Sequence, residues 1–153
     1  MAVVQYWSLG SVTTLMGAEL NSLASSSGLT AGAVTAGSFN NVQGGGGLGG
    51  YTMGLFELNL ATPAAALTAG TAAYVWLLNQ VDGTNFEDGG AAVIPARPAD
   101  VIIPVRATTT QRIIWLGYLP PNLWKVLLSH NTGQTWNASG NTLKVLPVTT
   151  QAV

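Results

Sequence analysis

The sequence contains no cysteine among its 153 residues. This absence excludes disulfide bonds, thiolate metal ligands and a cysteine nucleophile together. It is also what we expect of a protein made in a reducing cytoplasm, where disulfides rarely persist.

Charge is almost as scarce. Charged residues make up 7% of the chain and hydrophobic residues 48%, whereas a typical soluble domain carries about 25% charged residues. Disordered chains combine high charge with low hydrophobicity, so this composition predicts a folded domain whose polar surface consists of Thr, Ser, Asn, Gln and Gly. Because the net charge is only −1, copies of the protein repel one another weakly, and we expect it to associate readily.

What the chain lacks also bears on its partners. Its 5 basic and 6 acidic residues provide no basic patch for nucleic acid. It has no basic amphipathic helix for a membrane surface and no run of about 18 apolar residues for a spanning helix. The N-terminal residues Met1 to Tyr6 lack the basic region of a secretory signal. We therefore expect no nucleic-acid partner, no membrane partner and synthesis in the cytoplasm.

The strongest structural pattern lies in the stretch 111–146. Apolar runs at 113–116 and 123–129 are separated by Leu119-Pro120-Pro121-Asn122, where two prolines must interrupt a strand. Each run has the length and the β-branched or aromatic content that is typical of a strand.

Two more short strands are predicted later in the same stretch, at 135–137 and 142–146. They are set off by the turn signals Asn131-Thr132-Gly133 and Ser139-Gly140-Asn141, in which Gly can adopt a positive φ. Short strands with a turn between each pair indicate an antiparallel sandwich or barrel.

Three further strands are predicted before this stretch, at 51–60, 73–80 and 101–105. The first alternates apolar and polar residues, so one of its faces should be buried. The second is almost continuously apolar, as in a central strand. Pro104 either demotes the third to an edge strand or marks its end.

The first third of the chain is less regular. Apolar spacing predicts a short helix over 15–24, ended by the Ser and Gly residues that follow. Residues 28–50 are expected to form a loop that includes the glycine-rich segment 44–50. That segment lacks the following helix and the Lys of a phosphate-binding loop, so we do not assign it that role.

The best candidates for chemistry lie in the acidic turn that contains Asp82, Asn85, Glu87 and Asp88. Oxygen ligands in such a turn could bind Ca²⁺, but their spacing does not match an EF-hand loop. Paired carboxylates could hydrolyse a glycoside, but such pairs usually come from separate strands inside a cleft. A solvated turn is favoured, and we assign no catalytic residue, metal ligand or cofactor-binding residue.

Two other residue types invite a functional interpretation. The single histidine, His130, has no recognisable nucleophile or acid to work with, so a structural or surface role is favoured. Of the five tryptophans, Trp76, Trp115 and Trp124 lie in strong strands and are assigned to core or subunit contacts. Trp136 lies in a weaker segment, where it could be exposed.

Several segments together resemble a known class of protein. They are the run Glu19 to Ala24, the strand Phe56 to Leu60, the strand Tyr74 to Leu78 with the acidic turn after it, and the ending Leu119-Pro120-Pro121, Trp124 to Leu128 and Ala138 to Leu143. The pattern resembles small jelly-roll virion proteins of tailed bacteriophages that decorate or cement the capsid, and the resemblance covers roughly residues 15–148.

From the pattern and this resemblance we expect an all-β fold, an antiparallel two-sheet sandwich of jelly-roll type with eight strands. An N-terminal arm and one short helix should occupy 1–27, and the sandwich 28–153, within a single domain. The expected core residues are Phe56, Leu58, Tyr74, Trp76, Leu78, Ile114, Leu116, Val126, Leu128 and Val145.

The resemblance implies a structural virion protein rather than an enzyme. Such a protein would bind the lattice of the major capsid protein, stabilise the head, form a homo-oligomer and lie on the head surface after synthesis in the bacterial host. The alternative is a tail- or fibre-associated module that binds a receptor or glycan through exposed aromatic residues.

The N-terminal arm holds the residues that we predict in an intersubunit contact. Residues 1–12 are apolar and carry no charged side chain, which is an aggregation hazard unless the segment is covered. Pairing within its own sandwich or docking onto a neighbouring subunit would cover it. We predict that Tyr6, Trp7 and Leu9 lie in an intersubunit contact.

Overall fold

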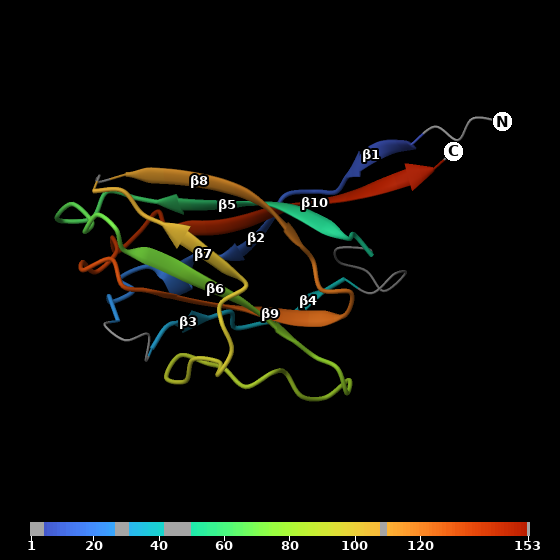
Figure 1. The fold of residues 1–153 in the computed structure, drawn as a ribbon, viewed down its shortest axis with the longest axis horizontal. Helices are drawn as coiled ribbons and strands as arrows, with labels where there is room; N and C mark the ends of the chain where they lie inside the picture. The colour runs from blue at the N-terminus through green and yellow to red at the C-terminus, as the bar shows by residue number, and fades with distance from the viewer. Residues whose placement is uncertain (1–4, 27–30, 42–49, 108–109, 153) are drawn as a thin grey trace.

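The computed structural model describes residues 5–26, 31–41, 50–107 and 110–152, and its secondary structure there is almost entirely β. The strands form two antiparallel sheets of five strand segments each. The sheets pack face to face, and the chain passes back and forth between them (Figure 1). Within these residues, no helix is long and apolar enough to cross a membrane.

The first sheet has the order β1-β10-β5-β8, with β2 pairing along the same edge of β10 as β1. Its strands are β1 (Gln5–Leu9), β2 (Thr13–Met16), β5 (Met53–Leu60), β8 (Gln111–Tyr118) and β10 (Thr142–Ala152).

The second sheet has the order β3-β9-β6-β7, with β4 pairing beside β3 on the same edge of β9. Its strands are β3 (Ala33–Val34), β4 (Phe39–Asn40), β6 (Ala72–Asn79), β7 (Val101–Pro104) and β9 (Leu123–His130).

This strand order is that of a jelly roll. Because β1 and β2 share one edge of β10, and β3 and β4 share one edge of β9, each sheet is four strands wide. Eight strand positions in two antiparallel sheets, in which each described connection between successive positions except β6 to β7 crosses from one sheet to the other, define the double Greek-key sandwich. The predicted fold class is therefore confirmed.

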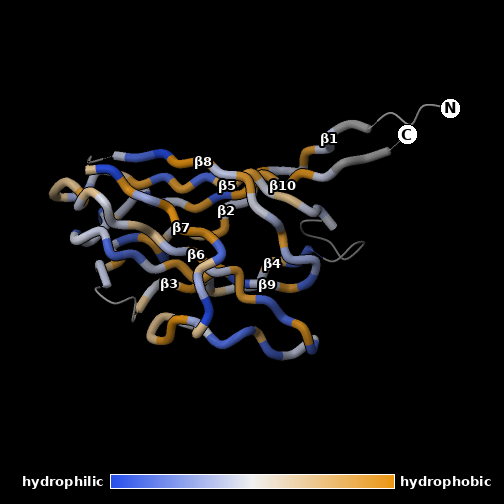
Figure 2. Tube along the Cα trace, in the orientation of Figure 1, coloured by the Kyte–Doolittle hydropathy of each residue, from blue (hydrophilic) through white to orange (hydrophobic). Residues whose placement is uncertain are grey.

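The main core lies between the two sheets. Among its buried members are five of the predicted core residues: Phe56, Leu58, Val126, Leu128 and Val145. Hydrophobic residues recur along the strands of both sheets (Figure 2). Alternation places every second residue of β5 inside, as the pattern of that strand predicts.

Trp76 and Leu78 are also buried, but they lie in a second cluster, together with Leu127. This cluster lies outside the sandwich core, between the second sheet and the long loop that joins β6 to β7. Tyr74, the remaining predicted core residue of β6, is only partly buried against this second cluster.

Ile114 and Leu116 were predicted in the core, and that prediction is wrong. Both side chains are 54% exposed, because β8 directs them to the outer face of the first sheet. Their neighbours Ile113 and Trp115 face inward and pack against the core. A continuous apolar run hides this alternation, since either face could have been the buried one.

The predicted helix over 15–24 is also wrong. Leu15 and Met16 are buried in β2, and only a 3-10 turn, Ala18–Leu20, follows them. Gly17 separates the two elements, and the β-branched residues Thr13 and Thr14 favour the strand.

Other differences from the predicted elements are smaller. The expected loop 28–50 contains the short strands β3 and β4, and its glycine-rich segment lies outside the described residues except for Gly50. Residues 135–137 are not a strand, and β10 extends well beyond the predicted 142–146.

Both ends of the chain form a two-stranded ribbon. β10 pairs with β5 only as far as Val148, whereas its pairing with β1 runs from Val148 to Ala152. Beyond Val148 this pairing has no third strand, and the ribbon projects from the body of the sandwich (Figure 1). The N-terminal arm is thus a strand of the first sheet that continues beyond its body.

Candidate functional site

Glu87 of the acidic turn belongs to an ion-pair cluster with Arg97 and Asp100, which we call the clasp. Arg97 forms an ion pair with Glu87 and, at 2.7 Å, a second one with Asp100. Arg97 also donates a hydrogen bond to the Leu77 carbonyl at 3.2 Å, while Asp100 accepts the Leu77 N–H at 2.6 Å. Hydrogen bonding to Glu87 raises the pKa of Arg97, so the guanidinium stays charged. The clasp therefore ties the loop to the free edge of β6.

Asp82 stabilises its own turn. Its carboxylate accepts the backbone N–H groups of Thr84 and Asn85 at 2.8 and 2.7 Å, which lowers its pKa to about 2. Within the residues that the structure describes, no three His, Asp or Glu side chains are grouped so that they could hold a metal ion. Asp82, Asn85 and Glu87 line one open hollow at this turn, in which Glu87 is already paired with Arg97.

His130 is fully buried at the end of β9 and has both ring nitrogens engaged. Its Nε2–H donates to the Leu23 carbonyl at 3.1 Å, and its Nδ1 accepts from the Thr132 hydroxyl at 2.8 Å. Burial lowers its pKa to about 4. An imidazole with no free nitrogen and no solvent access cannot exchange a proton with a substrate, which agrees with the structural role favoured by the sequence.

Trp136 belongs to the same cluster. Its indole is buried, stacks on His130, and donates to the Thr132 hydroxyl at 3.3 Å. The expectation that Trp136 could be exposed is wrong, because the turn after β9 folds back over the end of the sandwich.

The most unusual surface is the outer face of the first sheet. Pairing across β10, β5 and β8 aligns side chains in rows on this face: Leu146, Leu55 and Leu116 form one row, and Val148, Met53 and Tyr118 form the next. Leu55, Leu116 and Tyr118 are exposed, Leu146 and Met53 are half-buried, and Val148 is buried. We call this surface the apolar face.

The apolar face has charged groups at one end. Lys144, Glu57 and Ile114 form the row beyond Leu146, and Arg112 donates a hydrogen bond to Glu57 at 2.7 Å. Val12 adds another exposed apolar side chain next to this row, where it helps to line a shallow hollow. The face is therefore apolar over most of its length and charged along one margin.

At its other end the apolar face continues onto the ribbon. Leu9 pairs with Val148 and Trp7 with Thr150, so both side chains project on the same side as the apolar rows. Each is 61% exposed. The side chain of Tyr6, the third predicted contact residue, lies outside the described part of the structure.

The two sheets differ in how their outer faces are covered. On the second sheet, Trp76 and Leu78 are buried beneath the loop between β6 and β7, and Ile94 from that loop packs on them. Figure 1 shows this loop crossing the outside of the second sheet. No described segment of the chain covers the apolar face in this way.

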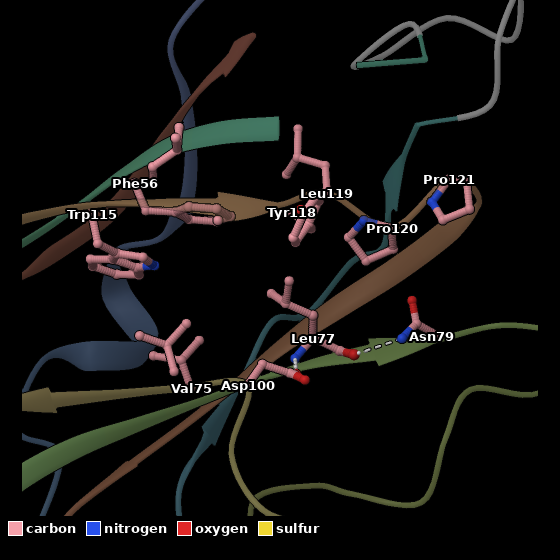
Figure 3. A pocket seen from close by; sticks show the side chains of 13 residues that line it. Phe56, Val75, Leu77, Asn79, Asp100, Trp115, Tyr118, Leu119, Pro120 and Pro121 are labelled. Atoms are coloured by element: carbon pink, nitrogen blue, oxygen red, sulfur yellow. Dashed lines mark hydrogen bonds between the residues drawn. The ribbon is translucent and has the colours of Figure 1, made fainter. Parts of the chain in front are cut away.

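A second surface lies at the open edge of the sandwich. An apolar groove of about 530 Å³ runs between β8 and β6, where β7 is too short to pair along the whole of β6. Phe56 and Trp115 form one wall and Leu77 the other, and Pro120 and Pro121 close one end (Figure 3). The Nε1–H of Trp115 is buried there without a hydrogen-bond partner.

Sequence reasoning missed the apolar face. A signal was available in the run Ile113-Ile114-Trp115-Leu116, because four consecutive apolar residues in a strand place two on each face. Only the cross-strand register shows that Leu55 and Leu146 lie beside the two outward residues.

Comparison of the chain with known protein families, curated proteins and solved structures found no match in any of the three.

Proposed function

We propose that this protein is a structural, non-catalytic subunit of a bacteriophage shell. In this role it binds the lattice of the major capsid protein on the head surface and stabilises the head as a decoration or cement protein. The resemblance over residues 15–148 supports the proposal, and the jelly-roll fold is the one that the resemblance implies.

The apolar face carries the proposal. The largest apolar patch on a typical monomer is about 300–600 Å², and larger patches mark association surfaces. Here, seven large apolar side chains on the apolar face and its margins are each at least 40% exposed; they are Trp7, Leu9, Val12, Leu55, Ile114, Leu116 and Tyr118. A surface of this kind suits a protein whose task is to assemble.

The chemistry of the polar residues is consistent with this role. Glu87, Arg97 and Asp100 hold a loop, and His130 is closed off by hydrogen bonds. Each of these groups has a structural task that accounts for its position without a substrate.

The test is binding to particles. Purified protein is mixed with heads that lack it, and sedimentation measures the bound fraction against the major capsid protein. We expect saturable binding at a fixed ratio over the whole head, and a higher temperature of genome release from decorated heads. A handful of copies at one end of the particle would support the tail- or fibre-associated receptor binder instead. No binding to heads or tails would overturn the proposal.

A further inference from the structure

We propose that the apolar face binds the same face of a second copy of this chain, forming a two-fold dimer with two sheets stacked face to face. The inference rests on the proposed structural role: it assigns the apolar face to self-assembly of the subunit and leaves the contact with the capsid lattice to the rest of the surface. Its evidence is the size of the face, its distribution of charge and the contrast with the second sheet.

The area of the face matches what a dimer needs. Standard-size protein interfaces bury about 800 Å² on each partner, and seven large apolar side chains that are each at least 40% exposed can supply most of such a patch. In a two-fold dimer both copies contribute the same patch, so a single contact covers all of these side chains at once.

The shape of the face suits another sheet. Its side chains stand in cross-strand rows on adjacent antiparallel strands, and such rows interdigitate when two sheets stack about 10 Å apart. The central row contains Leu55, Leu116 and Leu146, which are apolar side chains without hydrogen-bonding groups. This arrangement gives an apolar centre, as in the interfaces of homodimers.

The net charge of the chain and the charges at the margin of the apolar face are compatible with contact between two identical copies. The whole chain has a net charge of −1, so two copies approach without strong repulsion. The charged margin carries both signs, with Lys144 and Arg112 beside Glu57. A margin that contains both signs is self-complementary, because a two-fold axis can bring a cation of one copy to the carboxylate of the other.

The second sheet also has apolar residues on its outer face, and there the chain covers them itself. It covers Trp76 and Leu78 with its own loop, which Arg97 fastens to β6. The apolar face has no such cover among the described residues, and exposed apolar patches of this kind mark association surfaces. A second copy supplies the missing layer and is present wherever the first copy is.

The first experiment compares two arginine variants by analytical ultracentrifugation over a range of concentrations. Leu116→Arg places a charge in the apolar face, whereas Ile102→Arg places one on β7 of the second sheet, at a side chain of similar exposure, 56% against 54%. We expect wild type and Ile102→Arg to form dimers of equal affinity. Leu116→Arg should raise the dissociation constant more than about a hundredfold, because it buries an unpaired charge.

The second experiment does not depend on how Leu116→Arg folds. Because the chain has no cysteine, a single Leu116→Cys substitution allows a short bis-maleimide reagent to link only the same residue of two copies. We expect linked dimers with Leu116→Cys and almost none with Ile102→Cys. This result requires the identical-face geometry, since a head-to-tail contact would not bring the two cysteines together.

Several results would overturn the inference: a monomeric wild type at all concentrations, a closed ring of more than two copies, or equal dimerisation and crosslinking for both sites. These outcomes are separable from failure of the proposed function. A monomer that still decorates heads overturns only the dimer, whereas a dimer that ignores heads and tails overturns only the virion role. A wild type that stays monomeric until heads are added would show that the capsid protein, not a second copy, occupies the face.

Discussion

The imidazole of His130 stacks on the indole of Trp136 with ring centroids 4.3 Å apart and an interplanar angle of 11°. Thr132 links the two rings, because its hydroxyl accepts the Trp136 Nε1–H and donates to His130 Nδ1. The Leu23 carbonyl accepts the remaining His130 N–H. The Thr132 backbone N–H also donates to Nδ1, at 3.4 Å, and cannot turn away, so this arrangement favours a neutral imidazole with no proton on Nδ1.

We therefore predict that stability falls as the pH decreases from about 6.5 to about 4. Burial lowers the pKa of His130 to about 4 in the folded state, whereas an unfolded histidine titrates near 6.5. Between these values the unfolded chain binds a proton that the folded chain excludes, so acid favours unfolding. The stability contributed by the neutral ring is complete above pH 6.5 and is lost by pH 4, a difference on the order of 3 kcal/mol.

Urea unfolding at a series of pH values measures this effect, with His130→Asn as the comparison. The variant should be less stable at neutral pH and should show a flatter pH profile between 6.5 and 4.5. Asp82, with a pKa lowered to about 2, contributes only below that window. A wild-type profile that is flat from pH 7.5 to 4.5 contradicts the prediction.

A methyl group at Gly32 should destabilise the second sheet. A Cβ at this position would lie 2.5 Å from the carbonyl oxygen of Leu128, which belongs to the backbone of β9. Relief requires β3 to move away from β9, although Ala33 pairs directly with Leu128. We expect Gly32→Ala to lower the free energy of unfolding by about 1–3 kcal/mol.

Gly37→Ala is the matched control, because a Cβ there meets nothing within 4 Å. Its effect should stay within about 0.5 kcal/mol. Denaturant midpoints of the two variants decide the matter, and equal midpoints would show that β3 adapts without cost.

Removing the guanidinium of Arg97 should release the loop between β6 and β7. Arg97→Met loses both carboxylate partners and the hydrogen bond to Leu77. The side chain is about a third exposed, so the cost to global stability should be modest, about 1 kcal/mol. Local opening should increase, and hydrogen exchange should become faster at the amides of this loop and of Leu77.

Arg112→Met provides the control for Arg97→Met. Arg112 also pairs with a glutamate, Glu57, but its side chain is 69% exposed and it fastens no loop. Its stability should change by less than about 0.5 kcal/mol, with exchange in the loop unaltered. If both variants exchange alike, the clasp does not hold the loop.

The sequence predicts most of the second half of this fold. Pro120 and Pro121 divide β8 from β9 at the expected place, and the alternation of β5 identifies its buried face correctly. Turn residues mark where these strands end, and the alternation of apolar residues marks their buried faces, so the local sequence is sufficient to predict them.

Where prediction failed, the deciding information was not local. Leu15 and Met16 fit a helix or a strand equally well, and only their pairing with β10 makes them part of a sheet. Ile114 and Leu116 fit the core by composition, but the register with β5 directs them outward. The apolar face could not be seen before the register was known, because its residues come from five separate stretches of the chain.

The ribbon allows a last prediction. β2 pairs with β10 beside the body of the sandwich, whereas the described part of β1 pairs with β10 only from Val148 outward, where Trp7 and Leu9 are exposed. We expect the chain that lacks residues 2–10 to fold with nearly unchanged circular dichroism. Its self-association should weaken at least about thirtyfold, since one buried aromatic side chain contributes about 2 kcal/mol to an interface.

The double variant Trp7→Ser, Leu9→Ser separates the side chains from the backbone of the ribbon. It keeps the pairing of β1 with β10 and removes the two exposed apolar groups. If the contact is made by these side chains, the double variant should associate as weakly as the truncated chain. Unfolding of the truncated chain would place β1 in the core of its own sandwich, and full association of both variants would show that the ribbon lies outside the interface.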